Sequence, residues 1–396
     1  MWSVCRGERV KFLLRQIGLL LGMAMCAVSA FADPIDYEFL DARIRKLMER
    51  PDMMGLAVAV VENGEIRFVR GYGYTERNGA PVTPDTLFRW ASVSKGLAGS
   101  LAAQLDYEGV ISLDARISDY GTSLRLPGAG EQKANLRNLL SHRLGLSQRA
   151  YNGQLESGRR PSDIRASLVS SKPVCPVGAC FKYQNVAFDT ITEVFELKTG
   201  ETFEALAQRK VFRPLGMTSA TTTYAGLVGS GNYARPHTWS RESRVLFEDG
   251  ITLSYFDIPA AAGVSSSIRD LARFLQSQTG VRPSVFHPLA LKTAHTPLVR
   301  TPIVEDKVRT FYSGVDMAEY GLGWRVYHYQ GHVLVGHEGS VRGMRAIMMF
   351  DPEIKTGVVV VWNSNVSRPA AIQFEVMDMA YGFQKRDWMR LLNTGG

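Results

Sequence analysis

The sequence predicts a mixed α/β fold of the α+β kind. An antiparallel sheet built from both chain ends is flanked by helices, and a mainly helical lobe is inserted between them. Three observations support this prediction. A continuous apolar run over residues 56–61 precedes the turn dipeptide Asn63-Gly64. Strand-like segments separated by turn residues return between residues 324 and 362, and apolar residues in the middle recur at helical spacing.

The chain opens with a predicted secretory signal over residues 1–32. Basic residues precede an apolar run over 17–28, and Ala30-Phe31-Ala32 offers a small-x-small cleavage site. The apolar run is shorter than the roughly 20 residues that a bilayer requires. We therefore expect cleavage near Asp33, a periplasmic or secreted product, and no stable membrane anchor once the signal is removed.

The sheet is expected to begin soon after this signal. An amphipathic helix is predicted over 37–49, and the apolar run 56–61 indicates a strand buried on both faces. Asn63-Gly64 favours a two-residue hairpin turn, so a return strand is expected over 66–70.

The middle of the chain, residues 98–254, is predicted to be the mainly helical lobe, and residues 33–97 with 255–396 the sheet domain. Apolar residues at helical spacing in and around this lobe are Leu97, Leu101, Leu105, Phe188, Ile191, Val194, Phe195, Leu271, Phe274 and Leu275. C-terminal strands are expected over 324–329, 332–335, 345–350 and 358–362, followed by a helix over 369–381.

The charge of the chain argues against a nucleic-acid partner. Its 46 basic and 38 acidic residues give a net charge of +8, and removal of the signal leaves 42 basic and 37 acidic residues, or +5. The basic residues are scattered rather than clustered in one stripe. A mild positive bias would instead help to attract a small substrate that carries a carboxylate.

Two of the 4 cysteines lie in the predicted signal, and Cys175 and Cys180 remain. An extracytoplasmic compartment permits disulfides, and the short spacing predicts a bond between these two. One close pair supplies too few ligands for a metal ion.

Ser92-Val93-Ser94-Lys95 lies at the predicted start of a helix that ends near Gly109. Residues i and i+3 share one helix face with Cβ atoms about 5–6 Å apart, so the Lys95 ammonium can reach the Ser92 hydroxyl. A serine needs a base or a nearby positive charge to become a nucleophile, and the helix N-terminus adds partial positive charge where an acyl oxyanion would form. The alternative is a serine cap beside a solvated lysine.

Tyr183-Gln184-Asn185 follows the cysteine pair and precedes a helical run beginning near Val186. A phenol held between two cations would lose its proton more easily than at its usual pKa near 10, so Tyr183 is the candidate general base. Asn185 would hydrogen-bond Lys95 and a substrate amide carbonyl. The alternative is a tyrosine in an ordinary turn.

His337-Glu338-Gly339-Ser340 lies at the end of a predicted strand. A donor at position 337 would orient the tyrosine or bind a substrate carboxylate, and Gly339 would let the strand edge approach the substrate. The backbone N–H groups of Ser340 and Ser92 would form an oxyanion hole.

In this order, the serine, lysine, Tyr-x-Asn and His-x-Gly elements resemble the serine β-lactamase and penicillin-binding-protein (DD-peptidase) superfamily, and its class C branch most. The resemblance covers almost all of the chain after the signal, and implies a β-lactamase/transpeptidase-like fold. It also implies an acyl-enzyme on Ser92 with proton transfer by Lys95 and Tyr183. The segments that carry it further are Thr86–Lys95, Leu139–Leu146, Pro214–Met217, Ser266–Leu271 and Tyr320–Trp324.

Two departures bear on the activity that this resemblance implies. Class C enzymes usually have Lys-Thr-Gly as the third motif, whereas His337-Glu338-Gly339 resembles DD-peptidases and D-aminopeptidases. A literal Lys355-Thr356-Gly357 occurs later, but it follows the turn dipeptide Asp351-Pro352 and leads into a valine run, so we interpret it as the start of a strand.

The sequence therefore predicts an exported serine hydrolase, and a β-lactamase is the preferred activity. Its substrate would be a small β-lactam or a D-alanyl peptide. It is expected to need no cofactor and to be a monomer. The alternatives are a cell-wall DD-carboxypeptidase or D-amino-acid peptidase, a carboxylesterase on the same scaffold, and a non-catalytic penicillin-sensing module. His328, His332 and His337 would lie close together and could be imagined as a zinc site, but histidines near a turn are more often surface or packing residues. No metal is expected.

Overall fold

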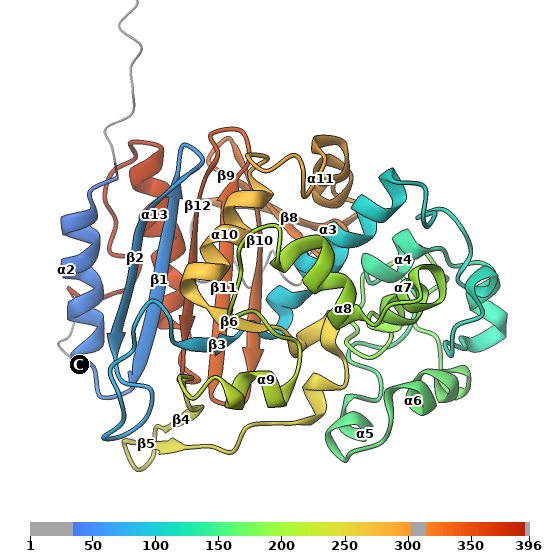
Figure 1. The fold of residues 1–396 in the computed structure, drawn as a ribbon, viewed down its shortest axis with the longest axis horizontal. Helices are drawn as coiled ribbons and strands as arrows, with labels where there is room; N and C mark the ends of the chain where they lie inside the picture. The colour runs from blue at the N-terminus through green and yellow to red at the C-terminus, as the bar shows by residue number, and fades with distance from the viewer. Residues whose placement is uncertain (1–34, 302–313, 393–396) are drawn as a thin grey trace, which may run out of the picture.

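The computed structural model describes residues 35–301 and 314–392, so the predicted signal lies outside the described residues (Figure 1). An eight-stranded antiparallel sheet with the order β2-β1-β12-β11-β10-β9-β8-β7 forms its centre. The strands are β1 (Gly55–Glu62), β2 (Glu65–Gly73), β7 (Val299–Arg300), β8 (Val315–Tyr320), β9 (Arg325–Tyr329), β10 (His332–Val341), β11 (Met344–Asp351) and β12 (Thr356–Trp362). Both chain ends contribute strands, which confirms the predicted architecture.

The first hairpin forms as the sequence predicts. Asn63 and Gly64 both have positive φ, 51° and 81°, and connect Glu62 to its partner Glu65. A two-residue turn of this kind matches the twist of the strands that it joins, and asparagine and glycine tolerate the conformation best. β1 is buried from Gly55 to Val61 because it lies between β2 and β12 with helices on both faces of the sheet.

Helices cover the sheet on both faces (Figure 1). On one face, the apolar side of α2 (Tyr37–Met48) and of α13 (Ile372–Ala380) packs with Val58 and Val60 of β1. The alternate residues of the same strand, Ala57 and Ala59, belong to the core that contains α3 (Ser94–Tyr107) and α10 (Ile268–Gln278). The strand period of two thus sends successive side chains into two separate cores.

Between β3 (Leu87–Arg89) and β6 (Ser265–Ser267), which pair with each other, the chain is mainly helical. After α3, its α-helices are α4 (Leu136–Leu140), α5 (Asn152–Glu156), α6 (Pro161–Ser167), α7 (Thr190–Thr199), α8 (Phe203–Ala207) and α9 (Tyr224–Gly229). All but α9 gather to one side of the sheet (Figure 1). A small hairpin, β4 (His237–Ser240) and β5 (Val245–Glu248), and helix α11 (Pro288–His295) complete the α-helices and strands of the described residues. The division into domains at residues 97 and 255 stays a prediction.

The structure differs from the sequence-based elements in several places, among them the unpredicted short strands β3, β4, β5 and β6. β7 and β8 extend the sheet beyond the predicted strands, and β10 continues past 335 to Val341, so His337 lies within a strand rather than at its end. The helix after Asn185 begins at Thr190 rather than near Val186. In the described part of the chain, no helix combines the length and apolar character that a membrane span demands.

Candidate active site

Ser92 lies in a short 3₁₀ turn, η1 (Ala91–Val93), that leads directly into α3. Ala91 has a positive φ of 46°, a conformation that costs of order 1–3 kcal/mol for a residue with a side chain. Neighbouring contacts hold this turn: the Trp90 backbone N–H donates to Val264 O at 2.9 Å, and its indole N–H donates to Ser266 Oγ at 2.9 Å. Ser92 is half-buried, whereas Ala91 and Val93 on either side of it are buried.

Lys95 is fully buried, and its Nζ has three polar neighbours. It lies 2.9 Å from Asn185 Oδ1, 2.8 Å from the carbonyl oxygen of Ala261, and 3.3 Å from Ser92 Oγ. The amide and carbonyl oxygens can only accept hydrogen bonds, whereas the serine hydroxyl can also donate. A neutral amine has two N–H groups for the two oxygens and a lone pair for the serine proton.

Burial lowers the pKa of Lys95 well below its usual range, and the positive charges of Arg325 and Arg149 lower it further. The carboxyl of Asp189 opposes this shift. Burial of an ammonium group without a close anionic partner disfavours the charged form. The electrostatics therefore favour the neutral amine that the hydrogen-bond geometry accommodates.

Tyr183 is half-buried beside this pair, with its ring centroid 4.7 Å from Lys95 Nζ. Burial raises the pKa of Tyr183 to about 12, although a hydrogen bond with Ser92 and the charges of Arg325 and Arg149 act to lower it. The sequence-based expectation of an easily ionised phenol is wrong in direction, because desolvation exceeds the effect of the two cations. In the resting site the phenol is a proton donor.

Asn185 is buried, and its Oδ1 accepts from Lys95 Nζ. This bond orients the amide group and leaves the N–H₂ end as a donor, as the sequence analysis expected for contact with a substrate carbonyl.

Strand β10 brings the third motif against the nucleophile turn. A Cβ atom on Gly339 would lie 2.2 Å from the carbonyl oxygen of Trp90 and 3.1 Å from the backbone nitrogen of Ser92. Only glycine permits this approach. Ser340, the next residue, is exposed at the same strand edge. The predicted oxyanion-hole residues therefore lie on two segments in direct contact.

His337 is 1 % exposed, and both of its ring nitrogens have partners within the protein. Nδ1 lies 2.8 Å from the carbonyl oxygen of Glu338, and Nε2 lies 3.0 Å from the Tyr320 hydroxyl. Burial and the nearby cations Arg325 and Lys95 lower the pKa of His337 well below its usual range. His337 is therefore a neutral residue whose direct contacts are with the protein, and Tyr183 is not among its hydrogen-bond partners.

Asp189 is a site residue that sequence reasoning missed. It is 1 % exposed, and its Oδ1 accepts the backbone N–H of Ala260 at 2.9 Å, next to the Ala261 carbonyl that binds Lys95. Arg165 approaches its Oδ2 at 3.4 Å. Burial raises the pKa of Asp189 to about 7 despite these partners. Its only sequence signal was a carboxylate between the apolar residues Phe188 and Ile191.

Arg325 of β9 is a second missed residue, directly after the segment Tyr320–Trp324. Its guanidinium lies 5.8 Å from the Tyr320 ring centroid, and it lowers the pKa of Tyr183, Lys95 and His337. Its Nη1 is buried without a hydrogen-bond partner among residues 35–301 and 314–392. An unpaired buried donor close enough to Lys95 and Tyr183 to lower their pKa values favours an anionic group of a substrate.

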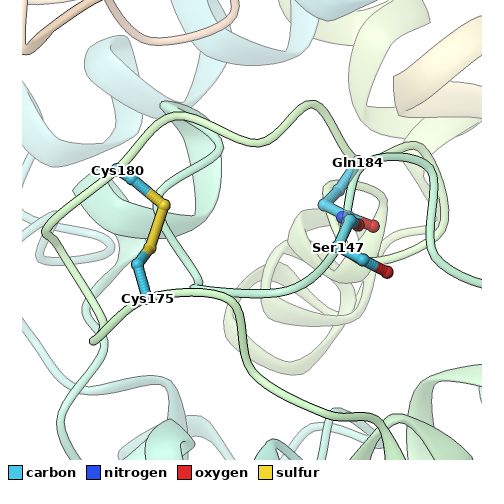
Figure 2. The surroundings of a disulfide bond; sticks show 4 residues. All are labelled: Ser147, Cys175, Cys180 and Gln184. Atoms are coloured by element: carbon cyan, nitrogen blue, oxygen red, sulfur yellow. A yellow bond between two sulfur atoms is a disulfide. The ribbon is translucent and has the colours of Figure 1, made fainter.

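The predicted disulfide between Cys175 and Cys180 is present (Figure 2). It lies in the segment that leads to Tyr183, and this segment runs along residues 142–149. The Lys182 N–H donates to His142 O at 2.9 Å, the Arg149 N–H donates to Tyr183 O at 2.8 Å, and the Gln184 side chain donates to the carbonyl of Ser147. These hydrogen bonds hold the segment in place on both sides of Tyr183.

The other sequence candidates lie elsewhere. Lys355 is exposed on a turn, where its carbonyl accepts the Gly64 N–H at 2.8 Å, and Thr356-Gly357 begins β12 as expected. His328 pairs with Glu319, and His332 stacks on Tyr381. Across the described ranges no group of three or more histidine, cysteine or acidic side chains is arranged to hold a metal ion.

A family comparison agrees with the motifs and their geometry. The profile of the family described as Beta-lactamase matches residues 40–378. This chain belongs to the beta-lactamase family. Membership makes it a hydrolase of the β-lactamase and penicillin-binding-protein superfamily.

Curated relatives of this beta-lactamase-family protein differ in their activities. It is 26% identical to a beta-lactamase of Yersinia enterocolitica over 83% of this chain and 86% of that protein. It is 27% identical to a D-aminopeptidase of Gluconobacter oxydans (87% of this chain, 62% of that protein) and 23% identical to an unguisins hydrolase of Aspergillus campestris (85% and 63%). The chain thus spans somewhat under two thirds of the last two relatives.

Solved structures confirm the β-lactamase/transpeptidase fold. A class C beta-lactamase mutant superposes with a TM-score of 0.69 at 20% identity, over 86% of this chain and 96% of that one. The octameric penicillin-binding protein homologue from Pyrococcus abyssi has a TM-score of 0.79 at 22% identity, over 89% of this chain and 79% of that one. The expected monomeric state of the present chain stays a prediction.

Proposed function

We propose that this hydrolase is a β-lactamase that forms an acyl-enzyme on Ser92 and releases it to water. The observation that carries the proposal is the set of three neighbours around Lys95 Nζ, two obligate acceptors and the Ser92 hydroxyl. In this arrangement the buried neutral amine is oriented to accept the serine proton.

The proton route is consistent with the directions of the two pKa shifts, which are lowered for Lys95 and raised for Tyr183. Ser92 Oγ transfers its proton to Lys95 Nζ as it bonds to the lactam carbonyl carbon. Tyr183, whose pKa is about 12, donates its phenolic proton to the lactam nitrogen as the C–N bond breaks, and Lys95 returns a proton to the phenolate. In deacylation, the same pair removes a proton from the attacking water and restores the Ser92 hydroxyl.

The developing oxyanion would be bound by the backbone N–H groups of Ser92 and Ser340. The close approach of Gly339 to Trp90 and Ser92 supports this assignment. Two such preorganised donors contribute more to the transition state than to the bound substrate, because the charge forms only during the reaction.

The carboxylate that β-lactams carry needs a cation, and neutral His337 does not supply one. Arg325, with its buried unpaired Nη1, is the candidate for this role, and the exposed Arg149 adds positive charge nearby. A substrate carboxylate that accepts from this buried Nη1 would form a strong charge-assisted hydrogen bond.

Intact-mass measurement over time tests the proposal. The purified chain without residues 1–32 is mixed with benzylpenicillin, beside Ser92→Ala. An adduct that forms and clears on the wild type alone, with hydrolysed penicillin accumulating, is the expected result. A chain that forms no adduct and hydrolyses no penicillin would overturn the proposal and direct attention to an ester substrate.

A penicillin-binding peptidase is the second candidate. The His337-Glu338-Gly339 motif and the similarity to a D-aminopeptidase favour it. The same residues would then attack a D-alanyl peptide bond. A penicillin adduct that persists for hours, together with release of D-alanine from a D-alanyl-D-alanine peptide, would select this candidate over the β-lactamase.

We also propose a periplasmic or secreted location for the enzyme. The disulfide supports it, because such bonds persist in oxidising compartments. Cell fractionation of the full chain and of a chain without residues 1–32 tests it, and equal retention of both in the cytoplasm would contradict it.

A further inference from the structure

A continuous hydrogen-bond chain connects the segment of Tyr183 with strand β10, and the mechanism above does not use it. It begins at the backbone N–H of Gln184, which donates to His142 Nδ1 at 3.1 Å. His142 Nε2 lies 3.2 Å from the Tyr320 hydroxyl, which lies 3.0 Å from His337 Nε2. The chain ends where His337 Nδ1 meets the carbonyl of Glu338 at 2.8 Å.

Backbone groups fix the direction of this chain from both ends. A backbone N–H can only donate, so His142 Nδ1 accepts and its Nε2 carries the proton. A backbone carbonyl can only accept, so His337 Nδ1 carries the proton and its Nε2 accepts. Both ends demand the same orientation of the Tyr320 hydroxyl, which accepts from His142 and donates to His337. Each of the three side chains therefore has one state that satisfies every partner.

The chain is dry. His142 and Tyr320 are 0 % exposed, and the rings of Phe181, Phe188 and Tyr183 surround His142. A buried polar chain is costly when one member is unpaired, so a fully satisfied chain specifies a single arrangement of the segments that it connects.

The connected segments carry the two halves of the site. His142 follows α4, and its ring centroid lies 4.4 Å from that of Tyr183, one residue before the Gln184 N–H that it binds. His337 is two residues before Gly339 in β10. Tyr320, at the end of β8, bonds to both histidines through its hydroxyl. The segment that carries Tyr183 and the strand β10 that carries Gly339 are thus connected through the hydroxyl of Tyr320.

We propose that Tyr320 is a positioning residue, which holds the Tyr183 segment and strand β10 in catalytic register through His142 and His337. The inference rests on the proposed acyl-enzyme function, since it concerns the geometry of that reaction.

Tyr320→Phe tests the inference, because it removes one hydroxyl and keeps the ring. It leaves His142 Nε2–H and His337 Nε2 without a partner. The acylation rate constant at saturating benzylpenicillin is expected to fall about 10- to 100-fold, since a displacement of about 1 Å can have an effect of this size. The benzylpenicillin concentration that gives half of the maximal acylation rate is expected to change less than about threefold. The reason is that proton transfer by Tyr183 affects the transition state rather than the binding of the substrate.

Tyr329→Phe is the matched control. Tyr329 is also a buried tyrosine of the same sheet, and its hydroxyl donates to Asp378 in a different core. The Tyr329→Phe variant is expected to be less stable than the wild type but to keep the wild-type acylation rate. Equal rates for Tyr320→Phe and Tyr329→Phe would overturn the inference.

A second pair of variants keeps the test decisive if Tyr320→Phe does not fold. His142→Gln retains an acceptor and a donor and is expected to keep most of the acylation rate, whereas His142→Leu is expected to lose as much as Tyr320→Phe. The inference fails if the two variants acylate equally fast.

The tautomers provide a readout that does not depend on activity. Nitrogen-15 NMR of the histidine rings is expected to show the Nε2–H form for His142 and the Nδ1–H form for His337, with His142→Gln and His337→Gln assigning the signals. The opposite tautomers would overturn the inference even in an active enzyme. A wild type that gives these tautomers but forms no acyl-enzyme would refute the proposed function and, with it, the role of Tyr320 in acylation.

Discussion

The two walls of the active site are held in place by different means. Strand β10, which carries His337 to Ser340, is paired with β11 residue by residue, and Gly339 faces Ala346. The opposite wall carries Tyr183 and Asn185. Between Ser170 and Thr190, a range that the structure describes fully, that wall contains no helix or strand and is fastened by the disulfide and separate hydrogen bonds.

The two walls should respond differently to amino-acid substitutions. A strand in the middle of a sheet shares its register with its neighbours, so a displacement there must move several elements together. A loop fastened by individual links loses one link at a time, with a small energy for each. We expect abrupt effects from changes in the strand wall and graded effects from changes in the loop wall.

The largest effect is expected from Gly339→Ala in the strand wall. Its Cβ would lie 2.2 Å from the carbonyl of Trp90, so β10 must retreat from Ser92 and the oxyanion hole opens. The acylation rate with benzylpenicillin is expected to fall by about 10²–10³, as when an oxyanion donor is lost. Gly153→Ala is the control, since a Cβ there meets open space. Retained activity in Gly339→Ala would contradict the assigned approach of β10.

A smaller effect, on stability, is expected from Asp189→Asn in the loop wall. Burial raises the pKa of Asp189 to about 7 from an ordinary value of 3.8, so the folded state holds this proton more tightly than the unfolded state. The resulting stability is present below about pH 4 and is lost as the pH rises to about 7. Relative to Asp189→Asn, the wild type should lose a few kcal/mol over this window.

Urea unfolding of the wild type and Asp189→Asn at pH 4.5, 6 and 7.5 measures that difference. The control is Asp114→Asn, an exposed carboxylate paired with Arg137. Because that pairing lowers the pKa of Asp114 below its ordinary value of 3.8, its stability contribution is lost only at lower pH, and the difference for Asp114→Asn should stay constant between pH 4.5 and 7.5. A pH-independent difference for Asp189→Asn would contradict the raised pKa.

Removal of the disulfide should be milder still. Closing so short a loop stabilises a protein by about 2 kcal/mol in the chain-entropy description. Cys175→Ser with Cys180→Ser is therefore expected to lower the free energy of unfolding by about that amount and the acylation rate by less than about tenfold. A thiol reductant should affect the wild type in the same way and leave the double variant unchanged.

The smallest effect is expected from Lys355→Ala, which alters the Lys-Thr-Gly sequence on the far turn of the sheet. Lys355 is exposed, so the acylation rate should stay within about twofold and the stability within about 1 kcal/mol. A large loss of acylation in a folded Lys355→Ala protein would reverse our assignment of the third motif to His337.

The sequence predicted the parts of the fold that local chemistry determines. The Asn63-Gly64 turn, the β1 strand and the serine–lysine pair on α3 all depend on neighbouring residues, and each lies where the pattern indicated. β6 was missed because Ser265-Ser266-Ser267 has the composition of a loop and becomes a strand only by pairing with β3.

The parts of the site that escaped prediction depend on distant partners. His142 and Tyr320 are 178 positions apart and meet only in the folded chain. The raised pKa of Tyr183 follows from burial, which the motif Tyr183-Gln184-Asn185 does not encode. Two cations near a phenol predict a lower pKa, and only the packing around the ring shows that desolvation is the larger effect.

The adjacency of β1 and β12 has a consequence for how the chain folds. Leu56 pairs with Trp362, so two neighbouring strands of the sheet are built from residues 306 positions apart. During synthesis, β1 emerges early and has only β2 as a neighbour until the last strands leave the ribosome. Contacts at such separation form slowly, because a long loop must close first. The eight-stranded sheet therefore cannot close until β12 has been synthesised, and β1 keeps one unpaired edge for most of the time that synthesis takes.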